Sequence, residues 1–316
     1  MTPTSSSAWI AHFLASEPPR SKSLVVTIFG DSVAPHGGTM WLGSLIELAA
    51  PFGVNDRLLR TSVFRLAQEG WLVASRDRRR SSYAILPQAL ARFERANRRI
   101  YAPLEIRWDG TWTLVMAASG ALSAPMRAAL RKELVWEGYA QLAPGVFGHP
   151  ASDSAALDEL LGRCGARHQV FVCSASALPQ VASRSLPELV AEGWDLSDVS
   201  AAYEQFIAQF APLLALLAPH ALQADSAGGP LTAEQAFVIR TLLIHAYRRV
   251  QLHDPMLPVE LLPDPWPGAR AYELARSLYC AVQASAEQHV MAVMRREDAQ
   301  APQADGAFYQ RFGGLA

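Results

Sequence analysis

The chain has 316 residues, of which 50% are hydrophobic, and a formal net charge of −1 at pH 7. This length exceeds one average domain, so we expect two or three domains with ordinary hydrophobic cores. The apolar stretches fall short of the ~18 residues of a membrane span, and the N-terminus lacks the basic region of a signal peptide. Three widely spaced cysteines predict neither a disulfide framework nor a metal-binding pair and favour the reducing cytoplasm: Cys164, Cys173 and Cys280.

The near-zero net charge conceals an uneven distribution. Between residues 20 and 107, 14 Arg and Lys stand against 7 Asp and Glu, whereas from residue 108 onward 14 stand against 21. A basic N-terminal module joined to an acidic remainder is typical of a DNA-binding protein with a separate sensing or assembly body. A solvated basic surface without a partner would show the same asymmetry.

The first block, residues 21–87, has the pattern of a winged helix-turn-helix DNA-binding domain. Three helices are predicted over residues 23–33, 39–53 and 55–70, the last beginning at Asn55 or Asp56 as N-cap and ending at Gly70. Two short strands follow, which are joined by the turn RDRRR and end at Pro87. Residues 88–107 are expected to form a linker helix.

The third helix combines a buried stripe with a basic one. Leu59, Val63, Leu66 and Ala67 repeat at helical spacing and are expected to face the core. The other faces carry long donors that suit a recognition helix, and the following hairpin tip suits a wing that contacts the flanking backbone or minor groove. The predicted DNA-binding residues are Arg57, Arg60, Thr61, Arg65, Gln68, Arg76, Arg78, Arg79 and Arg80. The alternative is a solvated helix followed by a solubilising turn.

The second block, residues 108–183, alternates strands and helices. TWTLVMAAS, YAQLAPGVFGHP and HQVFVCSAS are predicted strands, and helices are predicted between them. This β-α-β-β-α-β-like order indicates a small ferredoxin-like α+β domain. Four aromatic residues near the element ends are expected to be core or dimer contacts rather than a ligand site: Trp108, Trp112, Trp136 and Tyr139.

The third block, residues 184–298, is predicted to be helical. A long helix begins near Ser197, and a second begins at Thr232 with Gln235 three residues later, which is the spacing of a capping box. A proline-rich crossing over residues 255–268 leads to a last helix over residues 269–297. The chain from Asp298 onward is expected to be frayed.

Three segments together resemble the PaaX family of bacterial transcriptional repressors. They are the N-terminal segment from SLVVTIFGDSV to the wing SRDRRRSSYAI, the middle segment WDGTWTLV with LVWEGYAQLAPGVFGHP, and HAYRRVQLHDPMLPVELLPDPWPGARA near the C-terminus. The resemblance implies a homodimeric repressor of phenylacetate catabolism with a winged-helix domain, a central Cas2-like domain and a helical C-terminal domain. It also implies release from operator DNA by phenylacetyl-coenzyme A (phenylacetyl-CoA), and no resident cofactor.

An acyl-CoA pocket needs cations, an aromatic wall and an apolar slot. The candidate effector-binding residues are Arg248, Arg249, His253 and Trp266. The competing interpretation is that the arginines bond the last carbonyls of their helix and that Trp266 fills the core. A winged-helix regulator of a different acyl-CoA and a winged helix used for protein contact alone remain alternatives.

Enzymatic activity is not expected. A Cas2-like nuclease needs a carboxylate pair at the end of its first strand, where this chain has Ala118, Ser119 and Gly120. The sequence contains no nucleophile elbow, phosphate-binding loop or H-E-x-x-H motif. His245 and His253, with Asp254, are expected to bond backbone groups rather than a metal, so no catalytic or metal residue is predicted.

Overall fold

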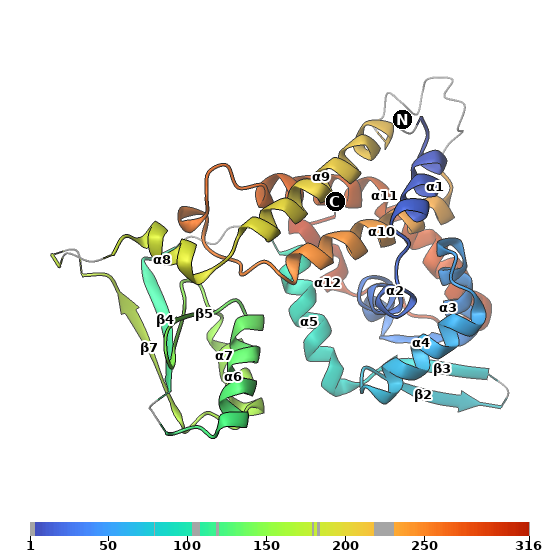
Figure 1. The fold of residues 1–316 in the computed structure, drawn as a ribbon. Coiled ribbons are helices and arrows are strands. Elements are labelled where there is room, and N and C mark those ends of the chain that lie inside the picture. The colour runs from blue at the N-terminus through green and yellow to red at the C-terminus, as the bar shows by residue number, and fades with distance from the viewer. Residues whose placement is uncertain are drawn as a thin grey trace. The chain divides into compact units, whose positions relative to one another are not determined.

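The computed structural model describes residues 4–78, 80–102, 108–117, 120–178, 180–181, 184–217 and 231–315 (Figure 1). The chain divides into two compact units. The first unit comprises Met1–Pro103, Glu204–Leu252 and Ala269–Ala316, and the second comprises Leu104–Tyr203 and His253–Gly268. Helices and two small sheets together confirm the predicted α+β class. In the described part of the chain, no helix has the length and apolar character needed to cross a membrane.

The N-terminal part of the first unit consists of helices around a three-stranded antiparallel sheet, with strand order β1-β3-β2. Its elements are α1 (Ser6–Ser16), α2 (Ser21–Ile28), a π-helical turn (Phe29–Val33), β1 (Thr39–Trp41), α3 (Leu42–Ala49), α4 (Asp56–Gln68), β2 (Leu72–Asp77) and β3 (Arg80–Ile85). The prediction that residues 39–41 begin a helix is wrong. They pair with Ser82–Ala84 of β3, and this long-range pairing overrides the local helical pattern.

Helix α4 has the boundaries and the core face that its sequence predicts. Asn55 is the N-cap, and its side chain accepts a hydrogen bond from the Leu58 backbone N–H at 2.9 Å. Leu59, Val63 and Leu66 are almost fully buried. A hydroxyl contact between Ser62 of α4 and Ser21 of α2 (2.9 Å) joins the two helices, so α4 is held by its back while its front faces outward.

Longer helices complete the first unit: α5 (Pro87–Tyr101), much of α9 (Ser197–Leu217), α10 (Ala233–Gln251), α11 (Gly268–Glu297) and α12 (Gly306–Tyr309). The predicted capping box of α10 is confirmed, because Thr232 and Gln235 exchange both hydrogen bonds. The expectation of a frayed end is wrong. Phe308, Arg311 and Phe312 are buried, and Arg311 bonds to groups near the start of the chain.

The second unit has a four-stranded antiparallel sheet of order β5-β6-β4-β7. Its elements are β4 (Thr111–Ala117), α6 (Ala124–Trp136), β5 (Ala140–Ala143), β6 (Val146–His149), α7 (Ser154–Arg163), β7 (Val170–Ser176) and α8 (Leu186–Gly193). Chain order and strand order together are those of a ferredoxin-like fold. The single strand predicted over residues 139–150 is in fact the hairpin β5–β6, which turns at Gly145 (φ +78°).

Apolar residues cover both faces of this sheet. On one face, Val115 and Phe147 pack with residues of α6 and α7, among them Leu130 and Leu160. On the other face, Trp112 packs with Trp194, Val190, Leu257 and Leu261. Of the four aromatic residues expected at cores or interfaces, Trp112 and Tyr139 are core residues, Trp108 packs against the second cluster, and Trp136 is 50% exposed.

Candidate nucleic-acid interface

The outward face of α4 carries all five helix residues predicted to bind DNA. Arg57, Thr61, Arg65 and Gln68 are exposed and recur every three or four residues, so they lie on one side of the helix. Arg60 is also exposed but forms an ion pair with Asp56 one turn earlier (2.6 Å), which partly neutralises it. The helix therefore presents three arginines at its surface: Arg57, Arg65 and the partly neutralised Arg60. Long hydrogen-bond donors of this kind can reach base edges and phosphates.

The sequence interpretation missed an aromatic residue on this face. Phe64 is 58% exposed and lies one turn before Gln68 and one turn after Thr61. Leu58, beside Arg57, is 47% exposed. The signal was present in the sequence, because a core stripe at residues 59, 63 and 66 leaves residue 64 on the opposite side of a helix.

The hairpin β2–β3 follows α4 and lies beside it (Figure 1). Arg76 and Arg78 are exposed, and Arg78 has a left-handed backbone conformation (φ +53°) at the turn. Arg79 lies outside the described residues. Arg76 and Arg78 therefore place two positive charges at the solvent-exposed surface of this hairpin.

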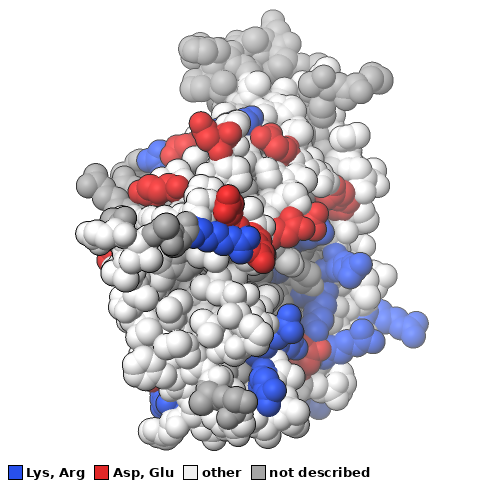
Figure 2. Space-filling view, turned by 60° about the vertical axis from the view of Figure 1, so that its left-hand side comes forward, with Lys and Arg blue, Asp and Glu red and all other residues white. Residues whose placement is uncertain are grey.

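Arg80 is engaged in contacts within the first unit. Its guanidinium lies 4.4 Å from the centre of the Trp41 ring, a cation–π distance. One of its nitrogens (Nη1) also donates to the backbone carbonyl of Glu297 at 3.3 Å. Arg80 therefore ties β3 to β1 and to the end of α11. Figure 2 shows Lys and Arg side chains exposed on the face that it draws.

A buried ionic cluster anchors the N-terminal helices to the C-terminal ones within the first unit. Asp31, in the π-helical turn after α2, forms ion pairs with Arg240 of α10 (3.0 Å) and Arg311 (3.1 Å), and all three are buried. The hydroxyls of Tyr101 and Tyr279 donate to the same carboxylate at 2.7 and 3.0 Å. The cluster thus fixes the end of α5, α10, α11 and the C-terminal segment around α2.

The pKa values in this cluster follow from burial and charge. Burial alone would lower the pKa of Arg240, but the charges of Asp31 and Glu287 outweigh it and raise the pKa above its ordinary value. Burial would raise the pKa of Glu287, yet its contacts with His36 and Arg240 lower it to about 2. Both groups are therefore held in their charged forms.

The four candidate effector residues divide between the two units. In the first, Arg248 is half-buried, donates to Ser23 Oγ at 3.1 Å, and has a pKa that burial lowers; Arg249 is exposed. In the second, His253 is exposed, and Trp266 packs edge-on against Tyr203 (5.9 Å between ring centres) within an apolar cluster. Each residue thus has a local structural environment, and their common role in a ligand site stays a prediction.

Within the described residues, no group of three His, Cys, Asp or Glu is arranged to hold a metal ion. The Nδ1 atom of His245 lies 3.0 Å from Thr27 Oγ1, and Asp254 accepts hydrogen bonds from the Tyr203 hydroxyl (2.6 Å) and the Met256 backbone N–H (2.7 Å). These side chains are occupied by structural contacts.

Comparison with known families decides the relationship of the chain. Residues 20–88 match the PaaX-like protein family, residues 105–188 the PaaX protein central Cas2-like domain, and residues 194–292 the PaaX-like protein C-terminal domain. The chain belongs to the PaaX family. The resemblance noted in the sequence is thereby confirmed, and so is the Cas2-like character of the ferredoxin-like unit.

Two individual proteins match along most of the chain. The transcriptional repressor PaaX of Escherichia coli (strain K12) is 38% identical over 308 residues, which cover 97% of this chain and 94% of that protein. A solved structure, the uncharacterized protein Rv0674 from Mycobacterium tuberculosis, matches with a TM-score of 0.52 and 26% identity over 86% of this chain and 98% of its own. Kinship with a repressor supports the expectation of a regulator rather than an enzyme.

Proposed function

We propose that this PaaX-family protein is a cytoplasmic transcriptional repressor that binds double-stranded operator DNA as a homodimer. The 38% identity to a transcriptional repressor over nearly the whole chain supports the repressor role. The observation that carries the DNA-binding role is the exposed face of α4, where Arg57, Thr61, Arg65 and Gln68 stand opposite a buried stripe.

In this proposal residues 21–87 act as a winged helix-turn-helix. Helix α4 lies in the major groove, where arginine side chains donate to guanine edges or phosphates and Gln68 can pair with adenine. The β2–β3 hairpin acts as the wing, and Arg76 and Arg78 contact the flanking backbone or minor groove. Arg80 takes a structural role in the wing because Trp41 and Glu297 already hold its guanidinium.

We further propose that phenylacetyl-CoA releases the protein from its operator, as the resemblance to the family implies. Arg248, Arg249, His253 and Trp266 are the candidate contacts for the thioester. Release requires that the ligand bind the DNA-free arrangement more tightly than the DNA-bound one, and linkage makes the antagonism reciprocal. The alternative effector is a different acyl-CoA. It would differ from phenylacetyl-CoA only in the acyl group, and so only in the part of the pocket that holds this group.

A second candidate function, protein contact through α4 without DNA, is favoured by the exposed Phe64 and Leu58. Large exposed apolar side chains commonly mark protein interfaces. The two functions predict different results when the arginines are replaced.

The test is binding of the full-length protein to a duplex that it selects from a randomised pool. The Arg57→Ala, Arg65→Ala double variant should abolish the specific mobility shift. The control is Arg270→Ala, which removes an exposed arginine of α11 that pairs with Glu204 of α9 and should leave the shift intact. Selection of a duplex whose shift survives the double variant would overturn the role of α4, and failure to select any duplex would favour protein contact.

A further inference from the structure

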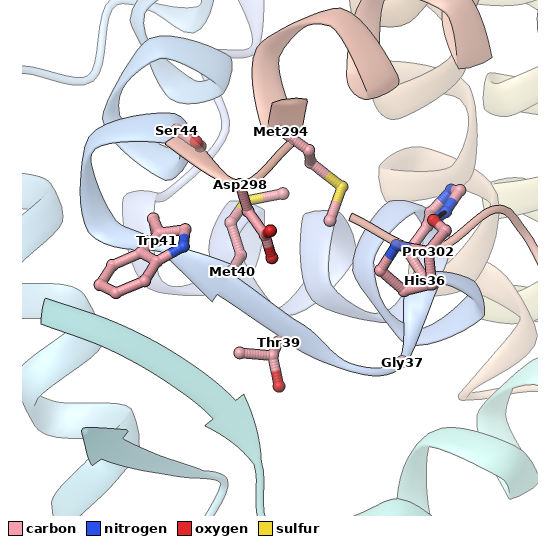
Figure 3. Close-up of a pocket in the computed structure, with 9 residues that line it drawn as sticks. All are labelled: His36, Gly37, Thr39, Met40, Trp41, Ser44, Met294, Asp298 and Pro302. Atoms are coloured by element: carbon pink, nitrogen blue, oxygen red, sulfur yellow. Dashed lines mark hydrogen bonds between the residues drawn. The ribbon is translucent and has the colours of Figure 1, made fainter. Parts of the chain in front are cut away.

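A cavity of about 250 Å³, open to solvent at the exposed residues Thr39 and Asp298, lies in the first unit between β1, α3 and the end of α11 (Figure 3). Its described lining residues are His36, Gly37, Thr39, Met40, Trp41, Ser44, Met294, Asp298 and Pro302. An engineered apolar cavity of about 150 Å³ holds one benzene molecule, so this cavity has room for one aromatic ring with a small substituent.

Polar contacts on both sides hold the two walls of the cavity at a fixed separation. The imidazole of His36 donates from Nδ1 to the Pro302 carbonyl at 2.8 Å, while its Nε2 lies 2.5 Å from a Glu287 carboxylate oxygen. On the other side, Ser44 Oγ donates to the Val293 carbonyl at 3.3 Å. These contacts join the segments that line the cavity, so the cavity is a feature of the folded unit.

The chemistry of the lining restricts what can bind. Met40, Met294, Trp41 and Pro302 supply apolar surface, and thioether sulfurs make favourable contacts with aromatic rings. Figure 3 shows the Asp298 carboxylate among these apolar side chains. None of the described lining residues is Lys or Arg, and the ring nitrogens of His36 are already engaged. The His36 ring is already paired with Glu287, so a guest with a negative charge would meet the Asp298 carboxylate without an uncommitted cation to offset it.

We infer that this cavity binds a small aromatic molecule that is neutral or positively charged. The inference goes beyond the proposed function, because it concerns a site separate from α4 and from the candidate thioester contacts. The site adjoins the proposed wing, since Trp41 carries the Arg80 guanidinium on its ring. A ligand in the cavity would therefore contact the ring on which the Arg80 guanidinium lies, and the ligand itself would not touch DNA.

Three probes of similar size distinguish the charge preference: benzamide, benzylamine and benzoate. Calorimetric titration of the full-length protein should show that benzamide and benzylamine bind about ten-fold or more tightly than benzoate. Asp298→Asn should weaken benzylamine and strengthen benzoate, because it removes the carboxylate. The matched control is Glu273→Gln, which neutralises an exposed carboxylate elsewhere on α11 and should change none of the three affinities.

Met294→Trp fills the cavity and should abolish binding of all three probes. Because this buried change can impair folding, a second readout uses the fluorescence of the folded protein. Benzamide should alter the emission of the wild-type protein, and Trp41→Phe should remove that change. The inference is overturned if no probe binds, if benzoate binds best, or if the affinities of the Asp298→Asn protein equal those of the wild type.

Discussion

Arg311 and Asp31 are 280 positions apart in the chain, yet the Arg311 guanidinium donates to both the backbone carbonyl of Asp31 (2.9 Å) and its carboxylate (3.1 Å). The same carboxylate pairs with Arg240, which also pairs with Glu287 (3.0 Å), so Asp31 contacts two buried cations. The relationship joins the first and last parts of the chain into one unit that also contains α4. We expect the rigidity of the proposed DNA-binding surface to depend on it.

Asp31→Asn should destabilise the first unit strongly. Removing one partner from a buried ion pair leaves an uncompensated charge and costs about 3–5 kcal/mol in the free energy of unfolding. Urea denaturation of the full-length protein measures this cost. The control is Glu204→Gln, which breaks the exposed pair with Arg270 and should cost less than about 1 kcal/mol. Similar costs for the two variants would show that the cluster does not anchor the unit.

His245 should make the stability of the protein depend on pH below neutrality. Burial, together with the positive charges of Arg248 and Arg249, lowers its pKa from 6.5 to about 4. Between these values the unfolded chain binds a proton that the folded chain excludes, so stability is complete above pH 6.5 and falls as the pH drops toward 4. The loss should reach about 2–3 kcal/mol.

The pH prediction is tested by urea midpoints at pH 7 and 4.5 for the wild type and His245→Gln. The variant should lose less stability over this interval than the wild type. The variant should still lose some stability between pH 7 and 4.5, because burial also lowers the pKa of His289 and so also makes the folded state less stable at low pH. If His245→Gln loses as much stability as the wild type between pH 7 and 4.5, this would contradict the burial of a neutral imidazole at this position.

Phe64 should contribute to sequence recognition through thymine methyl groups, if α4 lies in the major groove as proposed. Apolar side chains contact the thymine C5-methyl, and a lost methyl contact is worth about 1 kcal/mol. Replacing thymine by deoxyuridine, one position at a time, should weaken wild-type binding at one or two positions. Phe64→Ala should bind the thymine and deoxyuridine duplexes equally, with an unchanged salt dependence.

The control for Phe64 is Leu58→Ala, which shortens the other exposed apolar residue of α4 and should keep the sensitivity to deoxyuridine. Retained sensitivity in Phe64→Ala would assign the aromatic ring to another contact while leaving DNA binding itself in place. Loss of all binding in Leu58→Ala would instead indicate a general defect of the helix.

Gly138→Ala should destabilise the second unit. Gly138 follows α6 with φ +92°, and a Cβ there would lie 2.6 Å from the Pro255 carbonyl oxygen and 3.1 Å from His149 Nε2. Left-handed strain and a backbone clash together cost about 2–4 kcal/mol. Gly165→Ala is the matched control, since it has φ +64° and nothing within 4 Å of the added carbon. Equal melting temperatures for the two variants would rule out the close approach.

Local patterns in the sequence were sufficient to predict the elements whose contacts are local. The N-cap Asn55, the buried stripe of α4 and the capping box at Thr232 follow from spacings of three or four residues, which the sequence displays directly. The alternation of strands and helices in the second unit was also predictable from local patterns, but residues 139–150 were predicted as one strand and form the hairpin β5–β6. The exposed Phe64 could have been placed by the same helical spacing.

Elements that depend on distant partners were not predictable in this way. Residues 39–41 are apolar enough for a helix and become a strand only because β3 pairs with them. The segment after Asp298 has no strong periodicity, and it is ordered by Arg311, whose partner Asp31 lies near the other end of the chain. Arg78 and Arg80 lie in the same run of arginines, so the sequence does not distinguish their roles. Only the distant residues Trp41 and Glu297, which contact Arg80, give it a structural role.

The most direct measurement of the proposed function is a mobility shift of the DNA upstream of the protein's own gene, with and without phenylacetyl-CoA. We expect a specific shift that the thioester reverses and that free phenylacetate leaves unchanged. A shift that persists at saturating phenylacetyl-CoA would contradict the proposed effector, and the absence of any specific shift would contradict the proposed repressor.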